Sequence, residues 1–205
     1  MSEPAGVELD PRPHRPRLRD HLRSKLPEIA LEAFSVVLAI LLAFAVDEWR
    51  EERGHRAMAE RARQTIIREL RANRDELKGS YAGNEQVLLR LQREIADLEA
   101  GTGQSVSATM HLSQLSSAAF QAAQTTQAIQ FVDFEWLVRV GRVYELQKTY
   151  VVAQDAALEE VSIASGVLAG GAKPVMVMQR VRSRILTSQQ LAQGLLAAYA
   201  EAIGK

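Results

Sequence analysis

The sequence predicts an all-α protein in which one N-terminal transmembrane helix continues into a long helix and a small antiparallel helical bundle follows. Residues 29–46 include eleven Leu, Ile, Val or Phe residues and only one charged residue, Glu32. Apolar residues then recur at alternating steps of three and four from Ile66 to Leu98, which is typical of a helix that packs along one face. No segment alternates apolar and polar residues over the length of a strand.

These patterns divide the 205 residues into four parts. Residues 1–26 form a basic tail that is predicted to be disordered, residues 27–48 the transmembrane helix, residues 49–100 a long charged helix that is a stalk or a bundle helix, and residues 101–205 a helical domain that packs with it. The tail is rich in proline and arginine and has too few apolar residues to pack. We interpret its basic residues as a topology signal, with binding to anionic lipid headgroups as the alternative.

The length and composition of the apolar run favour insertion into a bilayer. Its eighteen residues would span roughly 27 Å as a helix, against a hydrocarbon core of about 30 Å. The large apolar residues contribute roughly −3 to −7 kcal/mol to insertion, whereas a carboxylate at the membrane centre costs about 2.5 to 3.5 kcal/mol. Two alternatives are a core helix buried on all sides in a soluble bundle and a signal peptide cleaved at Ala43-Phe44-Ala45.

Two residues near the ends of this run are the predicted membrane anchors. Glu32 lies near its start, and we interpret its carboxylate as reaching the interface, with pairing to a partner helix or a proton relay as the alternative. Trp49 follows its end, where amphipathic aromatic rings favour the membrane interface.

The charges on either side of the run predict the orientation. Six Lys and Arg residues lie between Pro11 and Leu26, and five arginines lie between Asp47 and Arg63. Because Lys and Arg set topology while acids contribute little, this bias predicts a cytoplasmic N-terminus and a periplasmic C-terminal domain. The chain contains no cysteine, which excludes a disulfide framework and a thiolate metal site.

The apolar residues of the long helix form a seam in which Asn73 and Asn84 occupy two positions. One interpretation is a dimerising stalk, and the other is a helix that packs on its own C-terminal domain. Gly79 and Gly83 are expected to kink or divide this helix. The residues of the expected association face are Leu88, Leu91, Ile95 and Leu98.

Three further helices are expected. The first covers Met110 to about Gln124, and the second runs from Phe134 to about Leu168 with Asp133 as its N-cap. Gly170-Gly171 should end the second helix, and Pro174 suits the first turn of the last one.

The sequence predicts no catalytic, cofactor-binding or metal-binding residue. None of the four histidines forms a spaced pair with another ligand residue. Asp155, Glu159 and Glu160 put two carboxylates on one helix face, which we expect to be solvated, with a cation site as the alternative. No nucleophile elbow or local triad motif is present, so we expect no enzyme. A net charge of zero provides no basic field for nucleic acid, so we expect no nucleic-acid partner.

Two clusters in the second half have open interpretations. Most aromatic residues lie between Phe120 and Tyr150, where we expect a domain core, with a ligand pocket as the alternative. A glutamine occurs at every third position from Gln121 to Gln130, where we expect a solvent-facing stripe, with a polar groove as the alternative.

Glu32, the apolar run and the following Asp-Glu-Trp-Arg-Glu-Glu-Arg at 47–53 together resemble an uncharacterised family of short bacterial single-pass membrane proteins. Residues 119–150 resemble a second block of that family. The chain departs from the family in lacking glycines in its span, where Ser35 and Ala39 are the nearest small residues. The resemblance implies an anchor in the bacterial inner membrane and an α-helical domain, and it implies no activity.

We therefore expect a non-enzymatic accessory or scaffold protein that is anchored in the lipid bilayer. It would act through helix–helix association, either as a homo-oligomer or within a membrane-protein complex, without a cofactor. The alternative is an extracytoplasmic sensor or ligand-binding module, in which the helical domain binds a small molecule near the aromatic cluster.

Overall fold

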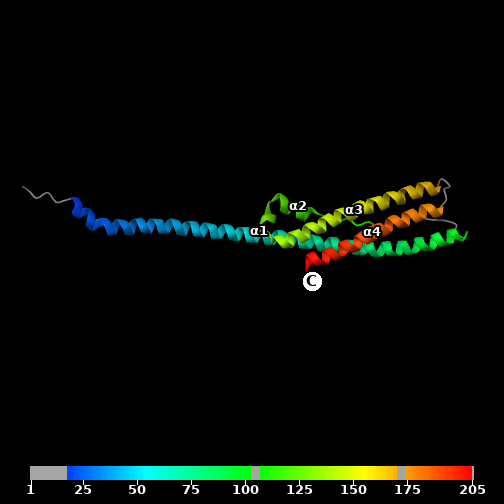
Figure 1. Ribbon diagram of the computed structural model, residues 1–205, viewed down its shortest axis with the longest axis horizontal. Coiled ribbons are helices and arrows are strands. Elements are labelled where there is room, and N and C mark those ends of the chain that lie inside the picture. The colour runs from blue at the N-terminus through cyan, green and yellow to red at the C-terminus, as the bar shows by residue number, and fades with distance from the viewer. Residues whose placement is uncertain (1–17, 103–106, 170–173, 205) are drawn as a thin grey trace, which may run out of the picture. The chain divides into compact units, whose positions relative to one another are not determined.

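The computed structural model describes residues 18–102, 107–169 and 174–204. Its elements are α1 (Leu18–Glu99), α2 (Ala118–Thr125), the 3-10 helix η1 (Ala128–Phe131), α3 (Phe134–Ala169) and α4 (Pro174–Ile203) (Figure 1). These three ranges contain no strand. The predicted fold class, an all-α chain with a long N-terminal helix followed by a helical bundle, is confirmed.

The chain divides into two compact units, residues 1–53 and residues 54–205, and α1 contributes to both. In the described part of the chain, α1 contains one stretch that is long and apolar enough to cross a membrane. The mean hydropathy of that stretch is 2.2 and none of it is buried, so the described residues do not enclose it as a core helix. Helix α1 begins at Leu18, so the end of the segment predicted to be disordered is helical, while residues 1–17 lie outside the described residues.

In the second unit, α1 and α3 run in the same direction. The Tyr144 hydroxyl of α3 donates a hydrogen bond to Glu69 of α1, and the Asn73 amide of α1 donates one to Gln147 of α3. Residues further along α1 therefore contact residues further along α3, which makes the two helices parallel.

Helix α4 runs in the opposite direction to α1. The Gln189 amide donates a hydrogen bond to the carbonyl of Tyr81, and the Gln179 amide donates one to the carboxylate of Glu99. Figure 1 shows α4 returning alongside α3 and the later part of α1. The core of the second unit is thus a bundle of three long helices.

Two groups of buried side chains fill this bundle. The seam predicted for the long helix points into both groups, because Ile66, Leu70 and Leu77 belong to the first and Leu91 and Ile95 to the second. The first group also includes residues from the other helices, among them Trp136, Val140, Tyr150, Leu195 and Tyr199. The second group also includes Ala157, Val161, Met178, Val181 and Ile185.

The prediction of a helix from Met110 to about Gln124 is wrong in its first part. Residues 107–117, which we call the strap, contain no helix, and α2 begins only at Ala118. The strap is rich in Ser and Thr, which compete with helical hydrogen bonding through their side chains. Its backbone groups bond instead to side chains of α1 and α3, as described below.

The helix ends follow the predicted signals, and the two glycines do not divide the long helix. The Asp133 carboxylate accepts a hydrogen bond from the backbone N–H of Trp136 at 2.8 Å, which makes it the N-cap of α3, and Pro174 is the first residue of α4. Gly170-Gly171 lie outside the described residues. Helix α1 continues without interruption through Gly79 and Gly83.

Candidate functional site

The apolar run of α1 presents large apolar side chains in every direction. Ten of them between Leu31 and Val46 are exposed, with exposed fractions from 45% at Leu38 to 70% at Leu31. They include the consecutive residues 36–38 and 40–42, which point to all sides of a helix that turns about 100° per residue. A surface helix of a soluble domain carries its apolar residues on one side only. This surface therefore requires an apolar environment that the described residues do not supply.

The two predicted anchor residues lie near the ends of this exposed run. At the first end, the Ser35 hydroxyl donates a hydrogen bond to the backbone carbonyl of Glu32 at 2.8 Å. At the other end, the Trp49 side chain is 56% exposed, and the guanidinium of Arg53 lies 5.0 Å from its ring centroid. The ring and the guanidinium form a cation–π pair that combines apolar surface with charge, as a membrane interface does.

The expected association face of α1 is buried within the same chain. The exposed fraction of Leu91 is 0% and that of Ile95 is 8%, and both belong to the second buried group. Leu88 and Leu98 are partly buried and pack against that group. Of the two interpretations of the seam, the structure favours the helix that packs on its own domain. Association with another chain would therefore need other residues.

The strap is fixed to α1 by two asparagines of the same seam. The Asn84 amide donates a hydrogen bond to the carbonyl of His111 at 2.8 Å, and its oxygen accepts one from the N–H of His111 at 2.7 Å. Asn73 makes the same pair with Ser116, at 2.7 and 2.9 Å. Each asparagine thus satisfies both backbone groups of one strap residue, as a neighbouring strand would.

Helix α3 holds the strap from its other side in the same way. The buried Gln154 accepts a hydrogen bond from the N–H of Ser113 at 2.7 Å and donates one to its carbonyl at 3.1 Å. The Tyr150 hydroxyl donates to Gln154 at 2.9 Å, and the hydroxyls of Ser80 and Ser113 are hydrogen-bonded to each other. These polar side chains supply hydrogen-bond partners to non-helical backbone that lies against two helices.

A glutamate of α1 caps the helix that follows the strap. The carboxylate of Glu69 accepts hydrogen bonds from the N–H of Ala119 at 2.9 Å, the hydroxyl of Ser116 at 2.7 Å and the hydroxyl of Tyr144 at 2.6 Å. Ser117, at the N-cap position of α2, makes no side-chain cap, so Glu69 supplies the acceptor and the favourable negative charge from another helix. Burial, the hydrogen bond to Glu69 and its charge raise the pKa of Tyr144.

The strap also explains one of the two glycines of the seam region. A Cβ atom added to Gly83 would lie 2.6 Å from the ring of His111, whereas one added to Gly79 would meet nothing within 4 Å. Gly83 therefore permits a close approach of the strap to α1 rather than a bend in the helix.

A cavity of about 470 Å³ lies next to the predicted aromatic cluster. Phe120 and Tyr144 line it, and their rings stack on each other with centroids 4.6 Å apart. Gln121 and Gln124 also line it, but the glutamine row does not continue, because Gln127 has a left-handed φ of 57° after the end of α2. Trp136 and Tyr150 are buried in the core, while Phe134 is exposed.

Asp155, Glu159 and Glu160 lie on α3. In the described ranges no group of three or more His, Cys, Asp or Glu residues is placed to hold a metal ion. Glu160 is instead paired with Arg180 of α4, with 3.0 Å between the carboxylate oxygen and the guanidinium nitrogen.

Comparison of the chain with protein-family models, with curated proteins and with solved structures gives no match.

Proposed function

We propose that this chain is a non-enzymatic, single-pass protein of the bacterial inner membrane, with a cytoplasmic N-terminus and its helical domain in the periplasm. One observation carries the proposal: the run from Leu31 to Val46 is helical, apolar in every direction and covered by none of the residues that the structure describes. Contiguous apolar surface of this extent marks an interaction site in a soluble protein or contact with lipid. The resemblance of the span and of residues 47–53 to bacterial single-pass proteins supports contact with lipid.

The orientation rests on the charges flanking the run, and a protease experiment tests it. A C-terminal epitope tag is added, and intact spheroplasts are treated with protease. Loss of the tag from full-length chains supports the proposed orientation. Survival of the tag until the spheroplasts are lysed contradicts it. A cytoplasmic protein that stays intact in the same sample serves as the control for spheroplast integrity.

The proposed role of this membrane-anchored chain is that of an accessory or scaffold protein that associates through a helix face. The outer side of α3 offers such a face, because Phe134, Val138, Val152 and Ile163 are between 45% and 74% exposed. At about 100° per residue, these four positions fall within about 40° of one another around the helix axis. With the exposed Glu145, which falls within the same arc, they form a mainly apolar stripe on the solvent side of the bundle, and a second copy of the chain is the proposed partner.

Two substitutions on this stripe test the association. Val138→Lys and Val152→Lys together place two charges on the stripe without touching a buried residue, and they are expected to reduce the oligomer of the full-length protein to a monomer in light scattering. The matched control introduces lysine at Gln190 and Gln193, which are exposed residues of α4. An oligomer of unchanged mass in the valine variant would refute the role of this face, as would a monomeric wild-type protein.

The second candidate is a ligand-binding or sensor module, and the cavity beside Phe120 and Tyr144 is the observation that favours it. Its volume of about 470 Å³ lies within the range of small-molecule sites. A thermal-shift screen of the full-length protein tests it, because a ligand that binds only the folded state raises the unfolding temperature. A hit whose effect disappears in Val152→Trp, which narrows this cavity from its exposed rim, would support this candidate. A screen without such a hit would count against it.

A further inference from the structure

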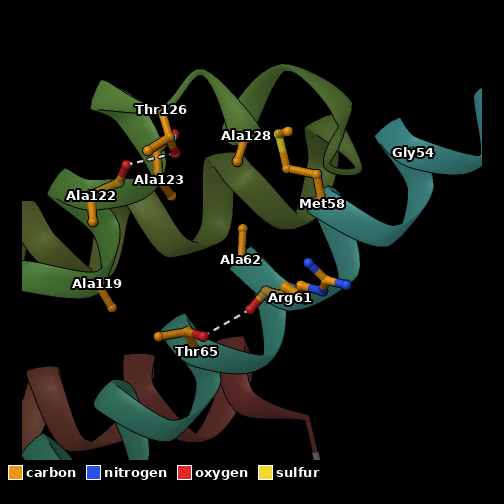
Figure 2. A pocket seen from close by; sticks show the side chains of 10 residues that line it. All are labelled: Gly54, Met58, Arg61, Ala62, Thr65, Ala119, Ala122, Ala123, Thr126 and Ala128. Carbon is orange, nitrogen blue, oxygen red and sulfur yellow. Dashed lines mark hydrogen bonds between the residues drawn. The ribbon is translucent and has the colours of Figure 1, made fainter. Parts of the chain in front are cut away.

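A second cavity of about 320 Å³ lies within the helical domain, between the first residues of its part of α1 and the segment formed by α2 and η1. Figure 2 shows α1 on one side of this cavity and α2 with η1 on the other. Small or apolar residues dominate its lining, which consists of Gly54, Met58, Arg61, Ala62, Thr65, Ala119, Ala122, Ala123, Thr126 and Ala128. Its volume is at the lower end of the range for small-molecule sites.

The polar atoms of this lining are already satisfied, with one exception. The Thr65 hydroxyl donates a hydrogen bond to the carbonyl of Arg61 at 2.8 Å, and the Thr126 hydroxyl donates one to the carbonyl of Ala122 at 2.8 Å (Figure 2). Both hydroxyls therefore already donate hydrogen bonds within their own helices and need no acceptor on a ligand. The wall that remains is made of alanine side chains and Met58, which suits an apolar ligand with few polar groups.

The exception is Arg61, the one charged residue of this lining. Its side chain is exposed, and no ion pair or hydrogen bond joins its guanidinium to another residue in the part of the chain that the structure describes. A guanidinium carries its charge at every physiological pH and binds carboxylate or phosphate oxygens through paired hydrogen bonds. An apolar cavity bordered by one such cation matches a molecule with an apolar tail and an anionic head.

The position of this cavity in the sequence indicates where such a molecule comes from. Gly54 is the eighth residue after Val46, the last residue of the apolar run. If the run spans a bilayer, as proposed above, the cavity belongs to the first residues that emerge from the lipid. The volume suits part of a single acyl chain rather than the two chains of a phospholipid.

We propose that this cavity binds an anionic amphiphile with one acyl chain, taken from the bilayer, with the chain against the alanines of α2 and the head on Arg61. A fatty acid and a lysophospholipid share this chemistry. The source of the ligand rests on the membrane anchor proposed above, whereas the site itself rests on the lining residues.

Photo-crosslinking of the full-length protein in phosphatidylcholine nanodiscs tests the proposal. The probe is a palmitate analogue with a diazirine in its chain, and the matched probe is the corresponding fatty alcohol, which lacks the negative charge. Cross-linked peptides are identified by mass spectrometry. We expect the palmitate analogue to label peptides from residues 54–65 and 118–128, in addition to the span.

Two pairs of variants make the test specific. Ala122→Phe fills the cavity from an exposed position and is expected to reduce labelling of these peptides to background, whereas Ala72→Phe, at an exposed position of α1 outside the cavity, leaves it unchanged. Arg61→Gln is expected to reduce labelling by the palmitate analogue by about tenfold and to leave labelling by the alcohol unchanged. Arg71→Gln, an exposed arginine on the same helix, is the matched control.

The results separate failure of the site from failure of the anchor. Unlabelled peptides at 54–65 and 118–128, or equal labelling in Ala122→Phe and the wild type, would overturn the site even if the span is labelled. Equal effects of Arg61→Gln on both probes would overturn the role assigned to the charge. If the probe does not label the span in the same sample, the result would contradict the proposed membrane anchor instead. Circular dichroism melting of each variant verifies that it is folded.

Discussion

Asn84 and His111 are joined by two hydrogen bonds, since the side-chain amide of Asn84 pairs with both the N–H and the carbonyl of His111. Asn84 belongs to a helix and His111 to the non-helical strap, 27 residues later in the chain. Asn73 and Gln154 repeat this arrangement at two further strap residues. The strap is therefore neither helix nor strand, and at these three residues side-chain amides supply the hydrogen bonds that a helix or a sheet would supply.

Removing one of these amides should destabilise the helical domain. Asn84→Ala leaves two partly buried backbone groups of His111 without partners, and we expect a loss of about 2–3 kcal/mol in the free energy of unfolding. Urea unfolding of the full-length protein in mild detergent, followed by circular dichroism, measures it. Gln92→Ala, at an exposed position of α1, should change the stability by less than about 0.5 kcal/mol. Equal stability of both variants would show that the strap contributes nothing to the fold.

Two glycines of α1 should respond to alanine in opposite directions. Gly79→Ala meets nothing within 4 Å and should stabilise the helix by about 0.5–1 kcal/mol. Gly83→Ala places a methyl group 2.6 Å from the His111 ring and should destabilise the protein despite the same gain in helix propensity. Adding His111→Ala to Gly83→Ala should restore the lost stability. If both alanines stabilise the protein, the strap does not approach α1 as described.

The buried seam can be separated from an association face by two neighbouring leucines. Leu91 is fully buried while Leu89, two residues away, is 52% exposed. Leu91→Ala should cost about 2–5 kcal/mol of stability because it leaves a cavity in the core. Leu89→Ala should cost less than about 0.5 kcal/mol. A Leu91→Ala protein of unchanged stability but smaller oligomer would restore the dimerising stalk as the better interpretation.

Two buried tyrosines predict sensitivity to alkaline pH. Burial raises the pKa of both Tyr144 and Tyr199 above the ordinary value of 10.0, and the charge of Glu69 adds to this shift. Above about pH 10 the unfolded chain loses these protons while the folded one keeps them, so stability is full below this pH and falls as the pH rises. Each tyrosine should contribute up to about 1.4 kcal/mol per pH unit to this fall.

The double variant Tyr144→Phe, Tyr199→Phe checks this expectation. It should start from a lower stability at neutral pH, because Glu69 and Gln147 each lose a hydrogen-bond donor. Its stability should then decline less steeply than that of the wild type when urea unfolding is repeated from about pH 9 to pH 11. Parallel declines in the two proteins would contradict the assignment.

The elements that the sequence predicted well depend on local signals. The cap at Asp133, the proline at the start of α4 and the apolar seam of α1 each act within a few residues, so the bounds of α3 and α4 could be inferred. The strap depends on partners 27 to 47 residues away in α1 and 31 to 41 residues away in α3, which no local pattern reveals. The one available signal was the presence of asparagines in an apolar seam, since buried polar side chains need partners.

The candidate sites also differ in whether local sequence signals or residues distant in sequence form them. The apolar run is contiguous, so its composition alone identified it. The small cavity draws its lining from α1, α2 and η1, and its residues are alanines and threonines that carry no motif. The cap at the start of α2 was hidden for a similar reason, because its acceptor Glu69 lies 50 residues before Ala119.

The most direct test of the membrane anchor uses the absence of cysteine from this chain. Single cysteines at Ala43, within the apolar run, and at Ala72, at an exposed position of the helical domain, are treated with a membrane-impermeant maleimide in intact spheroplasts. We expect Ala72→Cys to react at once and Ala43→Cys to react only after the membrane is dissolved in denaturing detergent. If Ala43→Cys reacts as fast as Ala72→Cys in intact spheroplasts, the apolar run is in water and the proposed anchor is wrong.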